Sequence, residues 1–407
     1  MDQGSLLFSF GRAFLLIIFL SYMVCSIAES RAKPKVFNVM DYGAIANGKT
    51  DNSKAFLRAW REACEWEGKA RVLIPQGTYM LYPVEFIGPC EGHMAFVIRG
   101  TLKAPSEAAQ AGFYSAEKWI NFRNVKGLGV GGGGTVDGQG AASWPLNDCG
   151  TNANCQTLPT TMRFDFVSNA RIHHLKSIDS KSTHFTIFGC ENLNITKVQI
   201  SAPSDSPNTD GIKIGTSRHV GISRATIGTG DDCVSVLPGS SDIRISEVVC
   251  GPGHGISVGS LGKYVDEKDV RGVIVRNSSL RETSNGVRIK TWATDYASTA
   301  SGFLFEDIVM DNVLNPITID QNYCPHGACN QKASSHVQIS NVVYKNIWGT
   351  SSSEVAVTLQ CSESAPCNNI VLGNINLSYH GSGRAPSSHC SHVNGFSFGK
   401  QSPPSCL

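Results

Sequence analysis

The sequence has little excess charge and, beyond its N-terminus, no long apolar run. Its 407 residues include 35 Lys and Arg against 33 Asp and Glu, a formal net charge of +2. A nucleic-acid-binding protein usually has a marked basic face, so this balance gives no support for that class. After residue 28 no stretch approaches the roughly 20 apolar residues that cross a bilayer. We therefore expect neither a nucleic-acid partner nor a membrane span.

The N-terminus has the pattern of a cleaved targeting segment. Arg12 precedes an apolar run over 13–24, and the small residues Ser26 and Ala28 follow it. This order of charge, apolar run and small residues resembles a secretory signal peptide. We predict a signal peptide over residues 1–28, a mature single domain over 29–407, and secretion to the extracellular space.

The cysteines lack the spacing of a zinc site, because there are no CxxC pairs and no clustered Cys and His ligands. All but Cys25 of the 14 cysteines lie beyond the signal peptide, and most fall close to another in sequence, which favours disulfides in a secreted chain. Cys190 is left over, so we predict a buried free thiol there. The predicted pairs are Cys64 with Cys90, Cys149 with Cys155, Cys233 with Cys250, Cys324 with Cys329, Cys361 with Cys367, and Cys390 with Cys406.

Three sequons for N-glycosylation suit a secreted chain. They are Asn194-Ile-Thr, Asn277-Ser-Ser and Asn376-Leu-Ser. Such sequons occur on the surface of secreted proteins when they are used. We predict glycans at these three asparagines.

A repeat organises the middle of the chain. Asn-Thr-Asp210-Gly, Gly-Asp231-Asp232-Cys and Gly-His254-Gly are each followed at once by an alternating apolar triplet typical of a short strand. Asp210, Asp232 and His254 follow one another at equal intervals of twenty-odd residues. One strand per period of this length indicates a solenoid, and a strand-only repeat indicates a parallel β-helix. The three residues are then stacked, about 4.8 Å apart from coil to coil.

The remaining chain extends this all-β solenoid. Asp51-Asn52-Ser53 offers capping side chains before a helix over Lys54 to Glu65, whose apolar face would cover the first coil. From Ser168 onward we predict one further series of strands, at Val198–Ile200, Val220–Ile222, Ile243–Ile245, Val273–Val275, Phe303–Phe305, Val337–Ile339 and Ile370–Leu372.

Alternation also predicts an outward-facing row on the site-bearing strands, made of Lys213, Ser235, Ser257, Arg288 and Thr318. Arg288 and Lys290 share that face. The expected result is a groove with carboxylates toward one end and cations toward the other. Close carboxylates push one pKa upward and leave an acid beside a base, which suits acid and base catalysis. A Ca²⁺ site is the competing use of the aspartates, but His254 and the lack of an oxygen-rich loop weigh against it.

Asn-Thr-Asp, Gly-Asp-Asp, Gly-His-Gly and Arg-Ile-Lys, in this order, resemble the four motifs of polygalacturonases, glycoside hydrolases of family 28. Asp41-Tyr-Gly-Ala and Gln321-Asn-Tyr323 extend the resemblance over nearly the whole mature chain, and the chain is most similar to plant pollen-type exopolygalacturonases. The resemblance implies a right-handed parallel β-helix that hydrolyses α-1,4 bonds between galacturonates of pectate, with inversion and without a metal or other cofactor. We expect a monomer.

The resemblance also implies a role for each motif residue. Asp231 would be the general acid, and Asp210 and Asp232 would position and deprotonate the water. His254 would bond near Asp231 and sustain its protonation. The residues expected to bind substrate are Arg288, Lys290, Tyr323 and Asn208.

Several alternatives remain open from the sequence. They are an endo-acting polygalacturonase, a rhamnogalacturonan hydrolase, a Ca²⁺-dependent pectate lyase, and a binding solenoid without activity. An open groove would allow endo cleavage, so exo action needs a wall at one end. The sequence leaves four candidates for this wall: Gly259–Val270, Thr291–Ser301, and the segments Cys149–Cys155 and Cys324–Cys329.

Overall fold

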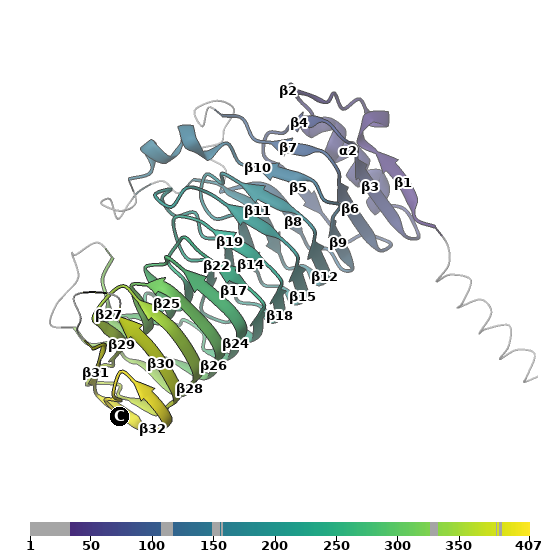
Figure 1. Ribbon diagram of the computed structural model, residues 1–407. Helices are drawn as coiled ribbons and strands as arrows, with labels where there is room; N and C mark the ends of the chain where they lie inside the picture. Colours follow the sequence, from purple (N-terminus) through teal and green to yellow (C-terminus); the bar gives the residue numbers. More distant parts are fainter. Residues whose placement is uncertain are drawn as a thin grey trace, which may run out of the picture.

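The computed structural model describes residues 33–106, 117–148, 155, 158–325, 333–379, 381 and 385–407. Its strands form successive coils stacked along one axis, with α2 at the N-terminal end and the C-terminus at the other (Figure 1). Strands of neighbouring coils pair in parallel. The chain is therefore a parallel β-helix, as the repeat predicts. The predicted signal peptide, residues 1–28, lies outside the described residues.

One sheet, called sheet 1, contains the strands that follow the three motifs. The predicted outward row is confirmed, because Lys213, Ser235, Ser257, Arg288 and Thr318 are Cα partners from strand to strand. The strands of sheet 1, in the order in which they pair, are β5 (Val84–Ile87), β8 (Lys118–Arg123), β11 (Thr160–Asp165), β14 (Phe185–Phe188), β17 (Ile212–Gly215), β20 (Val234–Val236), β23 (Ile256–Leu261), β25 (Asn285–Trp292), β27 (Asn315–Tyr323), β29 (Val355–Gln360) and β31 (Ser387–Ser391).

The other sheet, called sheet 2, has two rows of strands that later fuse. The first row is β1 (Lys35–Asn38), β3 (Ala70–Ile74), β6 (Met94–Ile98), β9 (Leu128–Gly131), β12 (Ser168–His173), β15 (Glu191–Thr196), β18 (Arg218–Ser223) and β21 (Ser241–Ser246). The second row is β2 (Asn47–Asp51), β4 (Thr78–Met80), β7 (Thr101–Lys103), β10 (Thr135–Asp137), β13 (Lys176–Ile178), β16 (Gln199–Ser201), β19 (Thr226–Gly228) and β22 (Val249–Cys250). Both rows continue in the long strands β24 (Val270–Arg281), β26 (Ser298–Val313), β28 (Val337–Ser351), β30 (Cys367–Tyr379) and β32 (Val393–Ser402).

The two rows correct the single strand series that the sequence predicted here. Ile200 lies in β16 and pairs with Ile227 of β19, so it does not share a row with Val220. Likewise Val342, and not Val337, pairs with Phe303. The two rows have the same period and the same alternation, so interval alone does not separate them. A residue with φ near +50°, such as Arg224, bends the chain between the rows.

The core fills the space between the sheets with the inward residues of every coil. On sheet 1 the inward residues of β17 and β20, Ile212, Ile214, Val234 and Val236, are fully buried. At the N-terminal end the filling is aromatic, with rings 5.0–5.6 Å apart along a chain of contacts formed by Trp60, Phe86, Phe96, Phe122 and Phe164. Each coil buries its inward side chains against those of the neighbouring coils. The outward side chains are not needed for this core, so they can form a binding or catalytic site.

The predicted capping helix is α2 (Ser53–Cys64), and its apolar residues Phe56, Ala59, Trp60 and Ala63 are buried. The Asn52 side chain does not cap it. That side chain binds the backbone of Ile45, Thr50 and Met80 instead. Beside α2 lies a pocket of about 740 Å³ lined in part by Lys54, Arg58 and Arg61. It is four coils from β17 and is separate from the aspartates.

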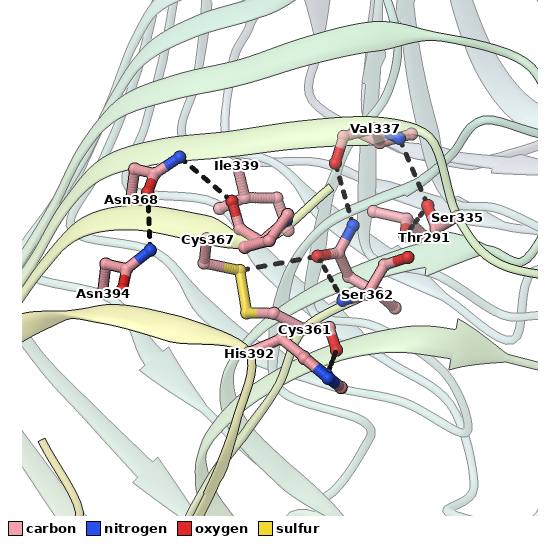
Figure 2. The surroundings of a disulfide bond; sticks show 12 residues. Thr291, Ser335, Val337, Ile339, Cys361, Ser362, Cys367, Asn368, His392 and Asn394 are labelled. Atoms are coloured by element: carbon pink, nitrogen blue, oxygen red, sulfur yellow. Dashed lines mark hydrogen bonds between the residues drawn. A yellow bond between two sulfur atoms is a disulfide. The ribbon is translucent and has the colours of Figure 1, made fainter. Parts of the chain in front are cut away.

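Four of the predicted disulfides are present in the described residues: Cys64–Cys90, Cys233–Cys250, Cys361–Cys367 and Cys390–Cys406. Figure 2 shows the Cys361–Cys367 bond, where the His392 ring contacts the carbonyl oxygen of Cys361. Cys149 and Cys329 lie outside the described residues, and so do their predicted pairings. Cys190 is a buried free thiol, as predicted, and burial raises its pKa to about 11.

The sequon asparagines Asn194, Asn277 and Asn376 are all exposed on sheet 2. Their side chains are therefore accessible to glycosylation, which remains a prediction. Among the described residues, no helix has the length and apolar character needed to cross a membrane.

Candidate active site

The three motifs lie at the corner that precedes three neighbouring strands of sheet 1. Asp210, Asp232 and His254 each stand two residues before β17, β20 and β23, whose first residues are in register. The backbone N–H of Gly211 donates to the carbonyl oxygen of Asp232 at 2.9 Å. Parallel pairing thus stacks the three residues, as their equal spacing predicts.

Two glycines of these motifs allow close backbone approach at this corner. A Cβ atom on Gly230 would overlap the carbonyl oxygen of Ser206, and one on Gly255 would overlap that of Asn285. Gly255 also has φ +85°, a conformation that L side chains rarely adopt. The glycines therefore shape the corner that holds the acidic groups.

Asp232 is the most enclosed of the three aspartates, at 2% exposed. Its Oδ1 accepts hydrogen bonds from Ser257 Oγ at 2.7 Å and from Arg288 Nη2 at 3.1 Å. Its Oδ2 accepts one from Lys290 Nζ at 2.7 Å. A buried carboxylate needs such charged partners to offset its lost hydration. Asp232 is therefore the centre of an ion-pair network.

Among the described residues, Lys213 is the cation that forms an ion pair with Asp210. Lys213 Nζ lies 3.1 Å from its Oδ1, and Ser235 Oγ donates to its Oδ2 at 3.0 Å. Burial raises the pKa of Asp210 to about 6, an effect that Lys213 opposes and that Asp231 and Asp232 reinforce. Asp210 therefore holds a proton more readily than an ordinary aspartic acid.

Asp231 and His254 form the more exposed pair of the cluster, with 19% and 45% of their side chains exposed. His254 Nδ1 lies 3.1 Å from Asp231 Oδ1, which also accepts the backbone N–H of Asp232 at 2.7 Å. Burial acts to raise the pKa of Asp231, but the hydrogen bond and charge of His254, with Lys290 and Lys213, hold it below its usual range. In this geometry His254 favours the ionised carboxylate, which is the opposite of the expected support for protonation.

The cations do not stand at the far end of a groove from the carboxylates. Arg288 and Lys290 come from β25, two coils beyond β20, yet both side chains reach back to Asp232. The expected separation is therefore wrong, because long side chains span coils that are only about 4.8 Å apart. Carboxylates and cations share one site.

An aromatic pair borders these cations. The Tyr323 ring centroid is 5.2 Å from Lys290 Nζ and 5.9 Å from the guanidinium carbon of Arg288. Trp292 packs edge-on against Tyr323, with ring centroids 5.4 Å apart. Rings and cations at these distances attract each other. The structure thus places Tyr323 beside Arg288 and Lys290, and its expected contact with substrate remains a prediction.

Comparison with known proteins identifies the chain. Residues 64–406 match the family described as Glycosyl hydrolases family 28. The chain belongs to this family. An exopolygalacturonase of Platanus acerifolia is 44% identical over 369 residues, which cover 90% of this chain and 97% of that relative.

Solved structures of the same fold are more distant in sequence. The endo-xylogalacturonan hydrolase of Aspergillus tubingensis is 23% identical with a TM-score of 0.77, covering 90% of this chain and 100% of that one. The hyperthermoactive exopolygalacturonase of Thermotoga maritima is 19% identical with a TM-score of 0.71, covering 90% and 89%. At sequence identities this low, the structural similarity supports the fold alone. The predicted right-handed parallel β-helix is thereby confirmed.

Some residues of this family 28 site were missed as site residues from sequence. Trp292 continues the outward alternation of Arg288 and Lys290, so that alternation is the signal that would have found it. Alternation predicts that Lys213 lies on the outward row, but it does not predict the ion pair of Lys213 with Asp210. Asn147, whose Nδ2 donates to Asn208 Oδ1 at 3.2 Å, has no sequence signal at all.

Asn208 has a backbone role that the motif alone does not reveal. Its φ of 56° lies in the left-handed region, which Asn tolerates better than most residues. Its carbonyl oxygen accepts a hydrogen bond from Ser182 Oγ at 3.5 Å. The expected contact of Asn208 with substrate therefore remains a prediction beside this structural role.

A metal ion fits this cluster poorly. Oxygen and nitrogen atoms of Asp231, Asp232 and His254 lie within 4.8 Å of one another, so three ligands could meet. However, Arg288 and Lys290 already neutralise Asp232. A divalent cation would have to displace these two positive groups, at a cost in electrostatic free energy. Catalysis without a metal remains the prediction.

Proposed function

We propose that this family 28 protein is a secreted, exo-acting polygalacturonase that hydrolyses α-1,4 bonds between galacturonates with inversion. The observation that carries the proposal is that Arg288 and Lys290 lie in direct contact with the aspartate cluster. A sugar that bears a carboxylate needs such cations, whereas a neutral glycan does not. The name of the relative from Platanus acerifolia, exopolygalacturonase, supports the exo mode.

In this proposal Asp231 is the general acid. Its side chain is more exposed than those of Asp210 and Asp232, at 6% and 2%, so it can approach a glycosidic oxygen at the surface. Its Oδ1 already accepts two hydrogen bonds, which leaves Oδ2 to hold the transferable proton.

The free protein holds the pKa of Asp231 low, so substrate has to raise it. A bound galacturonate carboxylate would offset the positive charges of Lys290 and Lys213, which lower that pKa. The sugar would also exclude water from the carboxyl group. Both effects raise the pKa of an acid. Substrate binding would therefore favour protonation of Asp231, which then donates this proton to the glycosidic oxygen.

Asp210 is the better candidate for the base. Inverting glycosidases separate acid and base by about 6.5–9.5 Å to admit a water molecule. Asp231 and Asp232 bring one carboxylate oxygen each to within 4.8 Å, a distance below that range. The raised pKa of Asp210, about 6, suits proton abstraction near that pH. Asp232 would then hold the two cations and orient the water.

Arg288, Lys290 and Tyr323 would bind the sugar. The guanidinium of Arg288 uses Nε on Ser257 and Nη2 on Asp232, and it has further N–H groups to offer. Lys290 likewise has three donors and uses one on Asp232. A galacturonate carboxylate would take up the free donors while the Tyr323 ring covers the sugar.

Product analysis over time on a galacturonate hexamer tests this function. We expect single galacturonate and the pentamer as the first products, with inverted anomeric configuration at the new reducing end. Early mixtures of dimers, trimers and tetramers would mean endo cleavage. A UV-absorbing unsaturated product, lost with a chelator, would mean a lyase. No released reducing ends would mean a binding solenoid, and preference for a rhamnose-containing backbone would mean a rhamnogalacturonan hydrolase.

The setting we propose is the plant cell wall, where the substrate would be pectate. The relatives named above are a plant enzyme and microbial enzymes, and the disulfides of this chain suit an oxidising extracellular compartment. We propose a monomer with no nucleic-acid or membrane partner.

A further inference from the structure

The segment Gln139–Asn147, between β10 and β11, runs forward along the corners that precede β14 and β17 of sheet 1. The backbone N–H of Gly138 donates to the carbonyl oxygen of Ile178 at 2.9 Å, and that of Gly140 to the carbonyl oxygen of Asp179 at 2.7 Å. The segment therefore begins by running along the next coil. It includes two short 3-10 turns, η3 (Gly140–Ala142) and η4 (Trp144–Leu146).

Side chains then fix the segment to the corner before β14. Trp144 Nε1 donates to the carbonyl oxygen of Ser180 at 3.0 Å, and Lys181 Nζ donates to that of Gln139 at 2.9 Å. Lys181 is 2% exposed and Ser143 is fully buried. A Cβ atom on Gly140 would lie 2.5 Å from the Ser180 carbonyl oxygen and 2.7 Å from the Trp144 ring, so only glycine permits this approach.

The end of the segment reaches the catalytic coil. Asn147 Nδ2 donates to Asn208 Oδ1 at 3.2 Å, and Asn208 stands two residues before Asp210. The segment thus leaves the chain before β11, passes the corner of β14, and ends at the corner of β17. The segment therefore reaches the coil of Asp210 from the N-terminal side, while Arg288 and Lys290 lie on β25 at the C-terminal side.

Two of the other insertions lie on that C-terminal side. Glu267 accepts the backbone N–H groups of Gly262, Lys263 and Tyr264, which closes the insertion after β23 on itself. Thr294 Oγ1 in the next insertion donates to the carbonyl oxygen of Gly262. Neither observation brings these insertions to Asp210.

We propose that the segment Gln139–Asn147 is the wall at which the terminal sugar stops, so that hydrolysis removes one galacturonate from a chain end. This inference rests on the proposed function. Trp144 and Asn147 are its specificity-determining residues, because they join the wall to the corners before β14 and β17. A polymer would extend past Arg288 and Lys290 but not past Asn208.

The test compares wild-type protein with Asn147→Ala and Trp144→Ala/Asn147→Ala. Each is given a galacturonate hexamer and, separately, polygalacturonate in a viscometer. We expect the wild type to release single galacturonate with a slow fall in viscosity. We expect the double variant to release dimers and larger products early. For the same number of reducing ends released, the viscosity of polygalacturonate should fall further than with the wild type. Asn192→Ala is the matched control, since it removes the Asn192–Asn169 bond of 3.2 Å on sheet 2.

Each outcome decides a different claim. If the wild type cleaves nothing, the proposed function fails. If the wild type is endo-acting, the wall is absent. If both variants still release only single galacturonate while folded, as judged by unfolding temperature, the segment is not the wall. If the double variant does not fold, Asn147→Ala alone decides, because Asn147 is only half-buried and its loss leaves the Trp144 anchor in place.

Discussion

Lys290 Nζ lies 2.7 Å from Asp232 Oδ2, although 58 residues separate the two in sequence. Both side chains are nearly buried, at 7% and 2% exposed. The cation that would bind substrate is therefore also the partner of a buried carboxylate. Binding and stability are coupled at this point of the molecule.

Lys290→Met should lower the free energy of unfolding by about 3 kcal/mol, because it breaks a buried ion pair and leaves Asp232 with Arg288 as its remaining ion-pair partner among the described residues. Denaturant unfolding would measure this. The control is Lys345→Met, since Lys345 pairs with Glu306 at 2.8 Å but is 39% exposed, and it should change stability little. If the two substitutions lowered the free energy of unfolding equally, the buried Lys290–Asp232 pair would contribute no more to stability than the exposed Lys345–Glu306 pair.

Lys213→Met should move the acid limb of the pH profile of kcat/KM to higher pH. A base has to be ionised, so activity falls as pH drops through the pKa of Asp210, which is about 6. Lys213 lowers that pKa, and its removal lets burial raise it further. Lys176→Met on sheet 2 should leave the limb in place. A limb that does not move in Lys213→Met would exclude Asp210 as the base.

Arg288→Lys should raise KM for oligogalacturonates with less effect on kcat. Lysine keeps the charge but loses the planar fork that reaches Ser257 and Asp232 together. Steady-state kinetics would measure both constants. Arg276→Lys, which alters a pair with Glu306 on sheet 2, serves as the control. Unchanged kcat and KM in Arg288→Lys would count against a carboxylate contact there.

Much of the architecture follows from the spacing of residues. Equal intervals between Asp210, Asp232 and His254 predict stacking, because parallel strands in register carry any fixed offset from coil to coil. Alternation likewise predicts that Arg288 and Lys290 share one face. These relations depend only on the backbone period, and they hold in the structure.

The partners of these residues could not be predicted in the same way. Arg288 and Lys290 contact Asp232 across two coils. This contact depends on side-chain length and burial, which the spacing of the repeat does not determine. Asn147 lies in a segment without sequence periodicity, so its contact with Asn208 of the Asn-Thr-Asp motif cannot be predicted from the repeat. The sequence pattern does not separate the two rows of sheet 2, because both rows alternate with the same period.

The central claim is that Asp231 donates a proton to the leaving sugar. Asp231→Asn, compared with the wild type on polygalacturonate and on a nitrophenyl galacturonide, tests it most directly. Loss of a general acid typically costs about 10²–10⁴-fold in rate. We predict a loss of this size on polygalacturonate, a much smaller loss on the nitrophenyl substrate, whose leaving group needs no proton, and an unchanged unfolding temperature. Equal losses on both substrates, or an active variant on polygalacturonate, would contradict the assignment.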